Sequence, residues 1–208
     1  MRELVDFFQD KKVLSVLDVG CGSGDFIEIL ARVFPEKTKI TGIDPFEGPL
    51  GEARRKFPSV EFLEMKGEQM EFPDNYFDVV SISFALHHLA DVPKTLSEMK
   101  RVVKPGGWLI VNEIVSEVQN EAQENQKMLH HLKSLTDRLN GIPHRETYSI
   151  NEVLEIVRSN GIVAGHSFLN LKMKEPSFTP DFLRDKISQM ENHFEKLKGH
   201  VLYKMKPT

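Results

Sequence analysis

The sequence contains one cysteine, no long apolar run and no extended basic tract. A single cysteine, Cys21, excludes an intramolecular disulfide and fits a reducing compartment such as the cytoplasm. No run approaches the roughly 20 apolar residues of a membrane span, and residues 1–12 lack the apolar core of a signal peptide. The net charge of −4 gives no sign of a nucleic-acid surface. We therefore expect a cytoplasmic protein without a nucleic-acid or membrane partner, and the sequence leaves its oligomeric state open.

What is present is a regular alternation of apolar strands and helices. The length of 208 residues is compatible with one domain, and we expect a single domain over 1–208. Alternating strands and helices predict a mostly parallel sheet with right-handed crossovers. The expected strands cover 13–19, 39–43, 60–65, 78–84 and 108–114, with helices at 25–34, 50–57 and 92–103. Beyond them we expect a long polar helix at 117–139, a helix at 149–159, a strand at 162–171, an inserted helix at 176–198 and a last strand at 201–205.

The most informative segment is an acidic, glycine-rich turn, Asp18–Gly24, between the first strand and the next helix. Glycines at every second position permit backbone conformations closed to other residues and let a ligand approach bare backbone. The N–H groups at the helix start attract the negative end of such a ligand. A dinucleotide fingerprint would need a third glycine at Asp25 or Ile27, and neither fits. This disfavours a nicotinamide oxidoreductase, and a turn without any ligand is the plainer alternative.

The pattern Asp-x-Gly-x-Gly-x-Gly closely resembles the first motif of class I S-adenosylmethionine-dependent methyltransferases. Two further segments, Phe72–Val80 and Arg101–Gly107, resemble the segments that lead into strands four and five in that family. Their expected role is structural, because tight turns there position the two strands. The resemblance covers roughly 10–115. It implies a Rossmann-like α/β fold with a seven-stranded, mainly parallel sheet, an antiparallel last strand and helices on both faces.

The resemblance also implies how the cofactor is held. In the family the turn cradles the methionine part of S-adenosylmethionine, and a carboxylate after strand two, here Asp44, accepts hydrogen bonds from the ribose hydroxyls. A turn-forming Asp before Pro45 is the alternative role for Asp44. Cys21 is expected to be a small packing residue rather than a nucleophile. The expected cofactor-binding residues are Asp18, Gly20, Cys21, Gly22, Gly24, Asp44, Glu68, Ser83 and Phe84.

One position departs from the family pattern. The family often carries an Asp at a fixed distance before the Phe-Pro turn, where it holds the adenine amino group, and by its spacing from Phe72 this chain has Lys66 there. A lysine offers no acceptor to an amino donor. Either Glu68 or the backbone is expected to take over the adenine contact.

The family chemistry implied is in-line transfer of a methyl group to a small-molecule acceptor, with S-adenosylhomocysteine as the product. Alignment matters most in such a reaction, with removal of a proton in some cases. Candidate bases are His87 and His88 after strand four, and His131 on the long helix; packing beside the cofactor is the alternative for the first two. The alternatives to a small-molecule enzyme are a cofactor-binding module without turnover and a methyltransferase acting on RNA or protein.

The segment 117–144 follows strand five, where related enzymes often close over the substrate, and we expect it to help choose the acceptor. It holds His130, His131, Asp137 and His144. Adjacent histidines on a helix point in different directions, and the spacing matches no standard zinc pattern. We therefore expect a polar, solvent-exposed helix and assign no metal site, and binding of a metal or of substrate by this cluster is the alternative.

Overall fold

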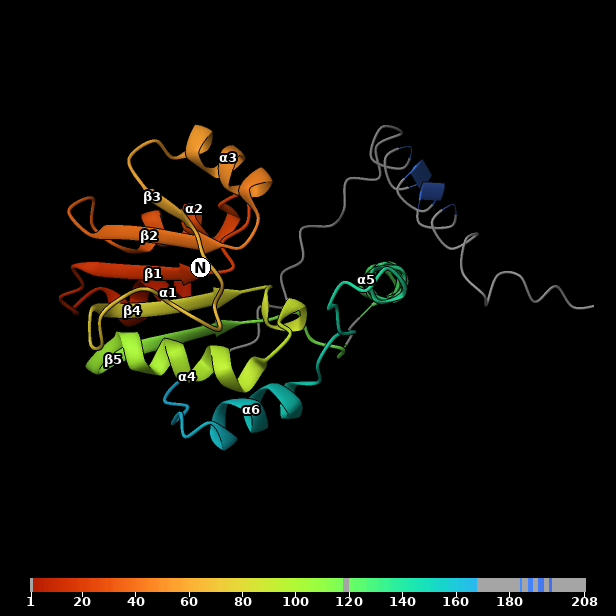
Figure 1. Cartoon of the computed structure of the whole chain (residues 1–208). Helices are drawn as coiled ribbons and strands as arrows, with labels where there is room; N and C mark the ends of the chain where they lie inside the picture. The colour runs from red at the N-terminus through yellow and green to blue at the C-terminus, as the bar shows by residue number, and fades with distance from the viewer. Residues whose placement is uncertain are drawn as a thin grey trace, which may run out of the picture. The chain divides into compact units, whose positions relative to one another are not determined.

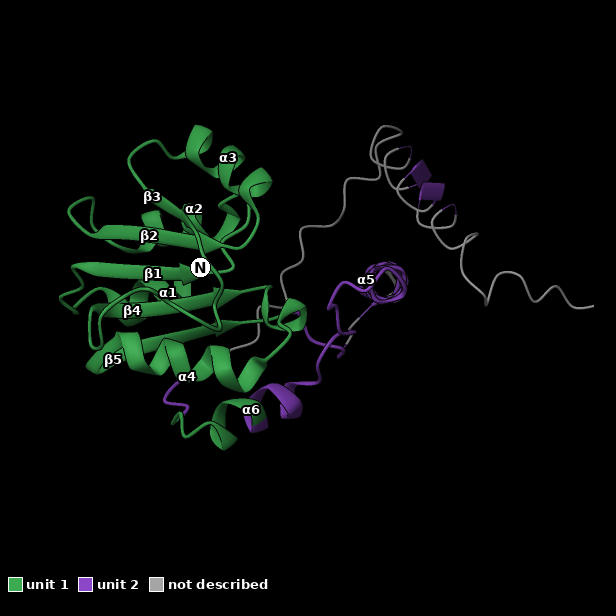
Figure 2. Cartoon of the chain, in the orientation of Figure 1, with its two compact units in different colours: residues 1–113, 156–163 green, residues 114–155, 164–208 purple. Residues whose placement is uncertain are grey.

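The computed structural model describes residues 2–117 and 120–167, together with 184, 187–188, 191–192 and 195. The chain forms two compact units, coloured separately in Figure 2. Unit 1 comprises residues 1–113 and 156–163, and unit 2 comprises 114–155 and 164–208. None of the helices in the described ranges has the length and apolarity that crossing a membrane requires.

Unit 1 is built on a five-stranded sheet in the order β3-β2-β1-β4-β5, in which every described pairing is parallel (Figure 1). The order reverses between β1 and β4, because β2 and β3 extend the sheet on one side of β1 and β4 and β5 extend it on the other. The strands are β1 (Ser15–Val19), β2 (Lys39–Asp44), β3 (Glu61–Glu64), β4 (Phe77–Ser83) and β5 (Val103–Asn112). The predicted parallel α/β architecture is confirmed.

The helices of unit 1 connect these strands. They are α1 (Arg2–Phe8), α2 (Asp25–Val33), α3 (Glu47–Lys56), the short 3-10 helix η1 (Leu86–His88) and α4 (Val92–Val102). Strand β1 is covered on both faces, since Val16, Leu17 and Val19 are all at most 1% exposed. The nearly continuous apolar run of its sequence reflects this two-sided burial. Ile27 and Leu30 of α2 are fully buried as well and belong to the same core.

The two turns that resemble family segments pack on each other. Asn75 has a left-handed φ of 57°, and its N–H donates to the Arg101 carbonyl at 2.9 Å. The Arg101 guanidinium donates to the carbonyls of Phe72 and Met70, at 2.7 and 2.8 Å. Arg101 therefore joins the turn before β4 to the end of α4, in agreement with the structural role predicted for both segments.

Unit 2 contains α5 (Glu121–Leu139), and α6 (Ile150–Ser159) runs from unit 2 into unit 1. The predicted helix at 117–139 begins later than expected, because the Asn120 side chain accepts the Gln123 N–H at 2.9 Å and caps α5. The capping box predicted for α6 is confirmed: Glu152 accepts the Ser149 N–H at 2.7 Å, and the Ser149 hydroxyl accepts the Glu152 N–H at 3.2 Å.

The prediction of seven strands is not met within the described residues, which form five. The strand expected at 162–171 is absent over 162–167, where no neighbouring strand pairs with the chain and Val163 is 92% exposed. A strand needs a partner to satisfy its backbone. Residues 168–171 and the last strand at 201–205 lie outside the described residues. Of the helix expected at 176–198, the few described residues, Arg184 and Ile187 among them, are helical.

Candidate functional site

The candidate site lies at the carboxyl ends of β1 and β4, where the order of the sheet reverses. Ligands of open α/β sheets bind at such a switch point. The glycine turn follows β1 here, and Gly20, Gly22 and Gly24 all have left-handed φ angles, of 67°, 52° and 89°. Gly24 precedes the first turn of α2 without a side-chain cap. The predicted strand, turn and helix start are therefore all present.

Gly20 and Gly22 are needed for different reasons. A Cβ at Gly20 would lie 2.7 Å from the Cβ of Ala85, so this glycine permits close packing between the turn and the segment after β4. A Cβ at Gly22 would meet nothing within 4 Å. Gly22 therefore presents bare backbone to open space, as a turn that receives a ligand must do.

Asp44 at the end of β2 is tied to this turn. Its Oδ2 accepts the Gly22 N–H at 3.0 Å, and its Oδ1 accepts the Phe46 N–H at 3.0 Å. Each carboxylate oxygen has a second lone pair, so these two bonds leave acceptor capacity for a diol. The turn-forming role that the sequence left open is thus real, and it is compatible with the ribose role.

Asp18 occupies a different place from the rest of the turn. Its side chain is 1% exposed, and the Ser81 hydroxyl on β4 lies 2.7 Å from its Oδ1. Burial raises the pKa of Asp18 to about 7, with the Ser81 hydrogen bond opposing the shift and Asp44 adding to it. The Asp18 side chain is thus held within the sheet by β4, and its contact with the cofactor remains a prediction.

Cys21 also faces inward. It is 7% exposed, belongs to the core, and its N–H donates to the Ile43 carbonyl at 2.9 Å. Burial, followed by the nearby carboxylates of Asp18 and Asp44, raises the pKa of the thiol well above its usual range. A thiol that stays protonated is a poor nucleophile, which supports the packing role expected for Cys21.

The turn that follows β3 reaches the same edge of the sheet. The Met65 N–H donates to the Asp44 carbonyl at 3.1 Å, and a Cβ at Gly67 would lie 3.0 Å from Val19 Cγ1. Glu68, the next residue, is half-buried, while Lys66 is exposed. An adenine contact from this turn, through Glu68 or through backbone, remains a prediction.

Ser83 and Phe84 end β4 beside the turn. The Ser83 hydroxyl accepts from Asn112 Nδ2 at 2.8 Å. Phe84 is 57% exposed and has a left-handed φ of 50°, although its N–H is held by the Asn112 carbonyl at 2.8 Å. Left-handed backbone in a bulky residue is costly and is concentrated at functional sites. An exposed ring held in this way offers a stacking surface to a planar ligand.

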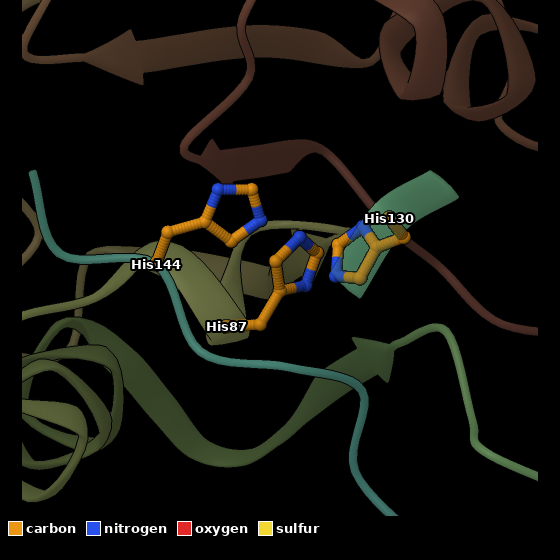
Figure 3. Close-up of side chains that lie close together, drawn as sticks. All are labelled: His87, His130 and His144. Atoms are coloured by element: carbon orange, nitrogen blue, oxygen red, sulfur yellow. The ribbon is translucent and has the colours of Figure 1, made fainter. Parts of the chain in front are cut away.

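The two histidines after β4, His87 and His88, differ in their exposure to solvent. His87 is buried on η1, and its Nδ1 lies 2.8 Å from Oε1 of Glu113, the residue that follows β5. The Glu113 side chain is 1% exposed, and its Oε2 also accepts the His87 N–H at 3.3 Å. His88 is exposed. His87 is one of the three side chains labelled in Figure 3.

His131, the third candidate base, belongs to unit 2. Its Nε2 lies 2.9 Å from the Thr147 hydroxyl, and its Nδ1 lies 4.0 Å from a Glu146 carboxylate oxygen. These contacts hold the ring within unit 2, and the catalytic role of His131 remains a prediction. The same holds for the expectation that 117–144 selects the acceptor.

A family model described as a methyltransferase domain matches residues 17–111. A solved S-adenosylmethionine-dependent methyltransferase from Aquifex aeolicus is 29% identical, with a TM-score of 0.61 over 79% of this chain and 80% of its own. The chain contains a class I methyltransferase domain. Most of the residues described above lie within this matched segment, whereas Asn112, Glu113 and His131 come after it in the chain.

Curated relatives of the methyltransferase domain carry quinone-related names. A ubiquinone/menaquinone biosynthesis C-methyltransferase of Campylobacter jejuni is 39% identical over 107 residues, which are 50% of this chain and 46% of the relative. A demethylmenaquinone methyltransferase of Chlorobaculum tepidum is 32% identical over 134 residues, 64% of this chain and 54% of the relative. The chain thus spans about half the length of the curated relatives it matches.

The residues of the methyltransferase domain fit S-adenosylmethionine. Bare backbone at Gly22 and the acceptor capacity of Asp44 match the methionine and ribose portions. A carboxylate near the turn would repel a pyrophosphate but suits a cationic sulfonium. Sequence reasoning missed Glu113, although an acidic residue directly after an apolar strand was the signal that identified Asp44.

Proposed function

We propose that this protein transfers the methyl group of S-adenosylmethionine to a small-molecule acceptor, with His87 as the base. The observation that carries the first part is the Gly22–Asp44 contact at the switch point of the sheet, in a domain that belongs to the methyltransferases. When bound, the cofactor supplies a methyl group on a positively charged sulfur, which departs as a neutral thioether. The chain has to bind the cofactor, align the acceptor and remove a proton.

His87 and Glu113 are suited to the removal of a proton. A carboxylate that accepts a hydrogen bond from Nδ1–H fixes the tautomer, so that Nε2 carries the lone pair. The same carboxylate stabilises the imidazolium that forms when Nε2 takes a proton. Glu113 is therefore a positioning residue for His87, and its carboxylate Oε2 also accepts the His87 backbone N–H of η1.

We propose a reduced quinone-type ring as the acceptor. The names of the relatives support this proposal: one is a C-methyltransferase of ubiquinone and menaquinone biosynthesis, and another is a demethylmenaquinone methyltransferase. Methyl transfer to a ring carbon releases one proton, and loss of a ring hydroxyl proton increases the electron density at that carbon. A base fixed at the carboxyl end of β4 would serve this step.

Methyl transfer from labelled cofactor to demethylmenaquinol, to simple hydroquinones and to a panel of unrelated metabolites tests the proposal. His87→Ala should lower kcat by roughly 10²- to 10⁴-fold, the usual contribution of a general base, with cofactor affinity unchanged. Glu113→Gln should lower kcat and displace the pH–rate profile. His88→Ala is the matched control, because His88 is exposed on the same short helix.

The outcomes separate the parts of the proposal. Transfer to a non-quinone acceptor alone would overturn the acceptor class, and equal losses in the His87 and His88 variants would overturn the assignment of the base. Cofactor binding without transfer to any acceptor would favour a binding module without turnover.

A further inference from the structure

The end of α5 reverses the chain in unit 2. Gly141 has a left-handed φ of 77°, and the Ile142 N–H donates to the Asp137 carbonyl at 2.9 Å, the bonding pattern of a Schellman cap. The Arg138 guanidinium then donates to the His144 carbonyl at 3.1 Å. The segment after α5 is thereby held against the last turns of the same helix.

This reversal places His144 against a carboxylate of α5. Its Nδ1 lies 2.6 Å from Asp137 Oδ2, and its side chain is 1% exposed. Lys133 also donates to Asp137 Oδ2, at 2.9 Å. A carboxylate this close accepts a hydrogen bond from Nδ1–H of His144, which places the lone pair of the ring on Nε2.

A second imidazole from α5 lies beside this one. The His130 and His144 ring centroids are 5.0 Å apart, and a ring nitrogen of each lies within 4.8 Å of the other (Figure 3). The Nε2 atoms of both rings are buried. His131 turns away to Thr147, as expected for neighbours on a helix. His144 is buried and lies beyond the end of α5.

We propose that His130 and His144 bind a divalent transition-metal ion in unit 2, with Asp137 as the carboxylate behind His144. Imidazole nitrogens suit zinc, nickel, copper and iron, and a carboxylate on the far ring nitrogen is the usual support of a metal-bound histidine. Nitrogens that share a tetrahedral zinc ion lie ~3.4 Å apart at Zn–N distances of ~2.0–2.1 Å. The ring nitrogens lie within 4.8 Å of one another, so metal binding requires a rotation of a side chain such as that of half-buried His130.

Two side-chain ligands leave coordination positions open. A closed structural zinc site has four protein ligands, whereas an open site keeps positions for water or a substrate oxygen. The ion bound here is therefore exchangeable. The sequence predicted no metal site because one ligand lies on α5 and the other beyond its end, so only the Schellman cap brings them together. Metal binding at this pair does not depend on methyl transfer.

Titration of the untagged, chelator-treated full chain with Zn²⁺ by calorimetry, and with Co²⁺ by visible absorption, tests the site without cofactor or acceptor. We expect saturable binding of one ion per chain. His130→Ala and His144→Ala should abolish it, and Asp137→Asn should weaken it roughly 10- to 100-fold. His131→Ala is the matched control and should bind like the wild type.

Circular dichroism of each variant shows whether it folds. If the buried His144 variant does not fold, His130→Ala and Asp137→Asn still decide the matter, because both residues are partly exposed. Replacing the remaining histidines of the chain one at a time identifies any further imidazole ligand. Absence of saturable binding in the wild type, or wild-type affinity in the His130 variant, would overturn the proposal, as would an equal loss in the His131 control.

Discussion

Gly20 and Gly22 lie in one turn, yet a methyl group added at each should damage the protein in different ways. Gly20 combines a φ of 67° with a built Cβ only 2.7 Å from Ala85 Cβ. Left-handed backbone costs a non-glycine residue about 1–2 kcal/mol, and overpacking a well-filled site costs about 1–3 kcal/mol. Gly20→Ala should therefore lower the free energy of unfolding by about 2–5 kcal/mol.

Gly22→Ala carries only the backbone part of that cost. Its φ is 52°, and the built Cβ meets nothing within 4 Å, so the loss of stability should be about 1–2 kcal/mol. The new methyl group projects toward the space proposed for the cofactor. A steric cost of about 1–3 kcal/mol there corresponds to a loss of affinity of roughly 5- to 150-fold.

Urea unfolding and calorimetric titration with S-adenosylhomocysteine measure the two effects separately. The titrations are made at a temperature at which both variants are folded. We expect Gly20→Ala to show the larger loss of stability and Gly22→Ala the larger loss of affinity. If Gly22→Ala bound the cofactor like the wild type, the claim that this turn presents bare backbone to a ligand would fail.

Three further predictions concern stability. Burial raises the pKa of Asp78, but the Lys104 ammonium and the donors from Leu14 and Ser15 outweigh it and lower the pKa from 3.8 to about 2. The ionised carboxylate should therefore add about 2 kcal/mol to the free energy of unfolding above about pH 4, and this contribution should be lost as the pH falls toward 2. Urea unfolding of Asp78→Asn should lack this dependence on pH. Burial raises the pKa of Asp18 to about 7. The free energy of unfolding of the wild type should therefore fall by roughly 4 kcal/mol as the pH rises from about 4 to 7. If plots of this free energy against pH stayed parallel for wild type and Asp18→Asn, the burial of this carboxyl would be contradicted. Arg101→Ala removes charged hydrogen bonds to the turn before β4 and should lower the free energy of unfolding by about 2–3 kcal/mol, with partial recovery in Arg101→Lys; an unchanged melting temperature in Arg101→Ala would refute this role.

The architecture of unit 1 was predictable because local signals and burial agree there. The apolar run of β1 is buried on both faces, and the glycines of the turn have the left-handed backbone that their pattern indicates. Asp44 was also predictable, since a carboxylate that ends a parallel strand reaches the ligand-binding edge. Element boundaries depended on caps such as Asn120, whose effect on the start of α5 is decided by a single hydrogen bond.

The remaining features depend on contacts between distant residues. Glu113 becomes informative only when β5 pairs with β4 and brings its carboxylate to His87. His144 pairs with Asp137 only because Gly141 reverses the chain after α5. The burial of Asp18 against Ser81 follows from the pairing of β1 with β4. Spacing along the sequence carries none of this information.

Calorimetric titration of the wild-type chain with S-adenosylhomocysteine and, separately, with NAD tests the central claim most directly. The site described here predicts saturable binding of S-adenosylhomocysteine that is weakened in Asp44→Ala, and no binding of NAD. Absence of heat with S-adenosylhomocysteine at millimolar concentration, or saturable binding of NAD at the same turn, would contradict the proposal that this chain uses S-adenosylmethionine.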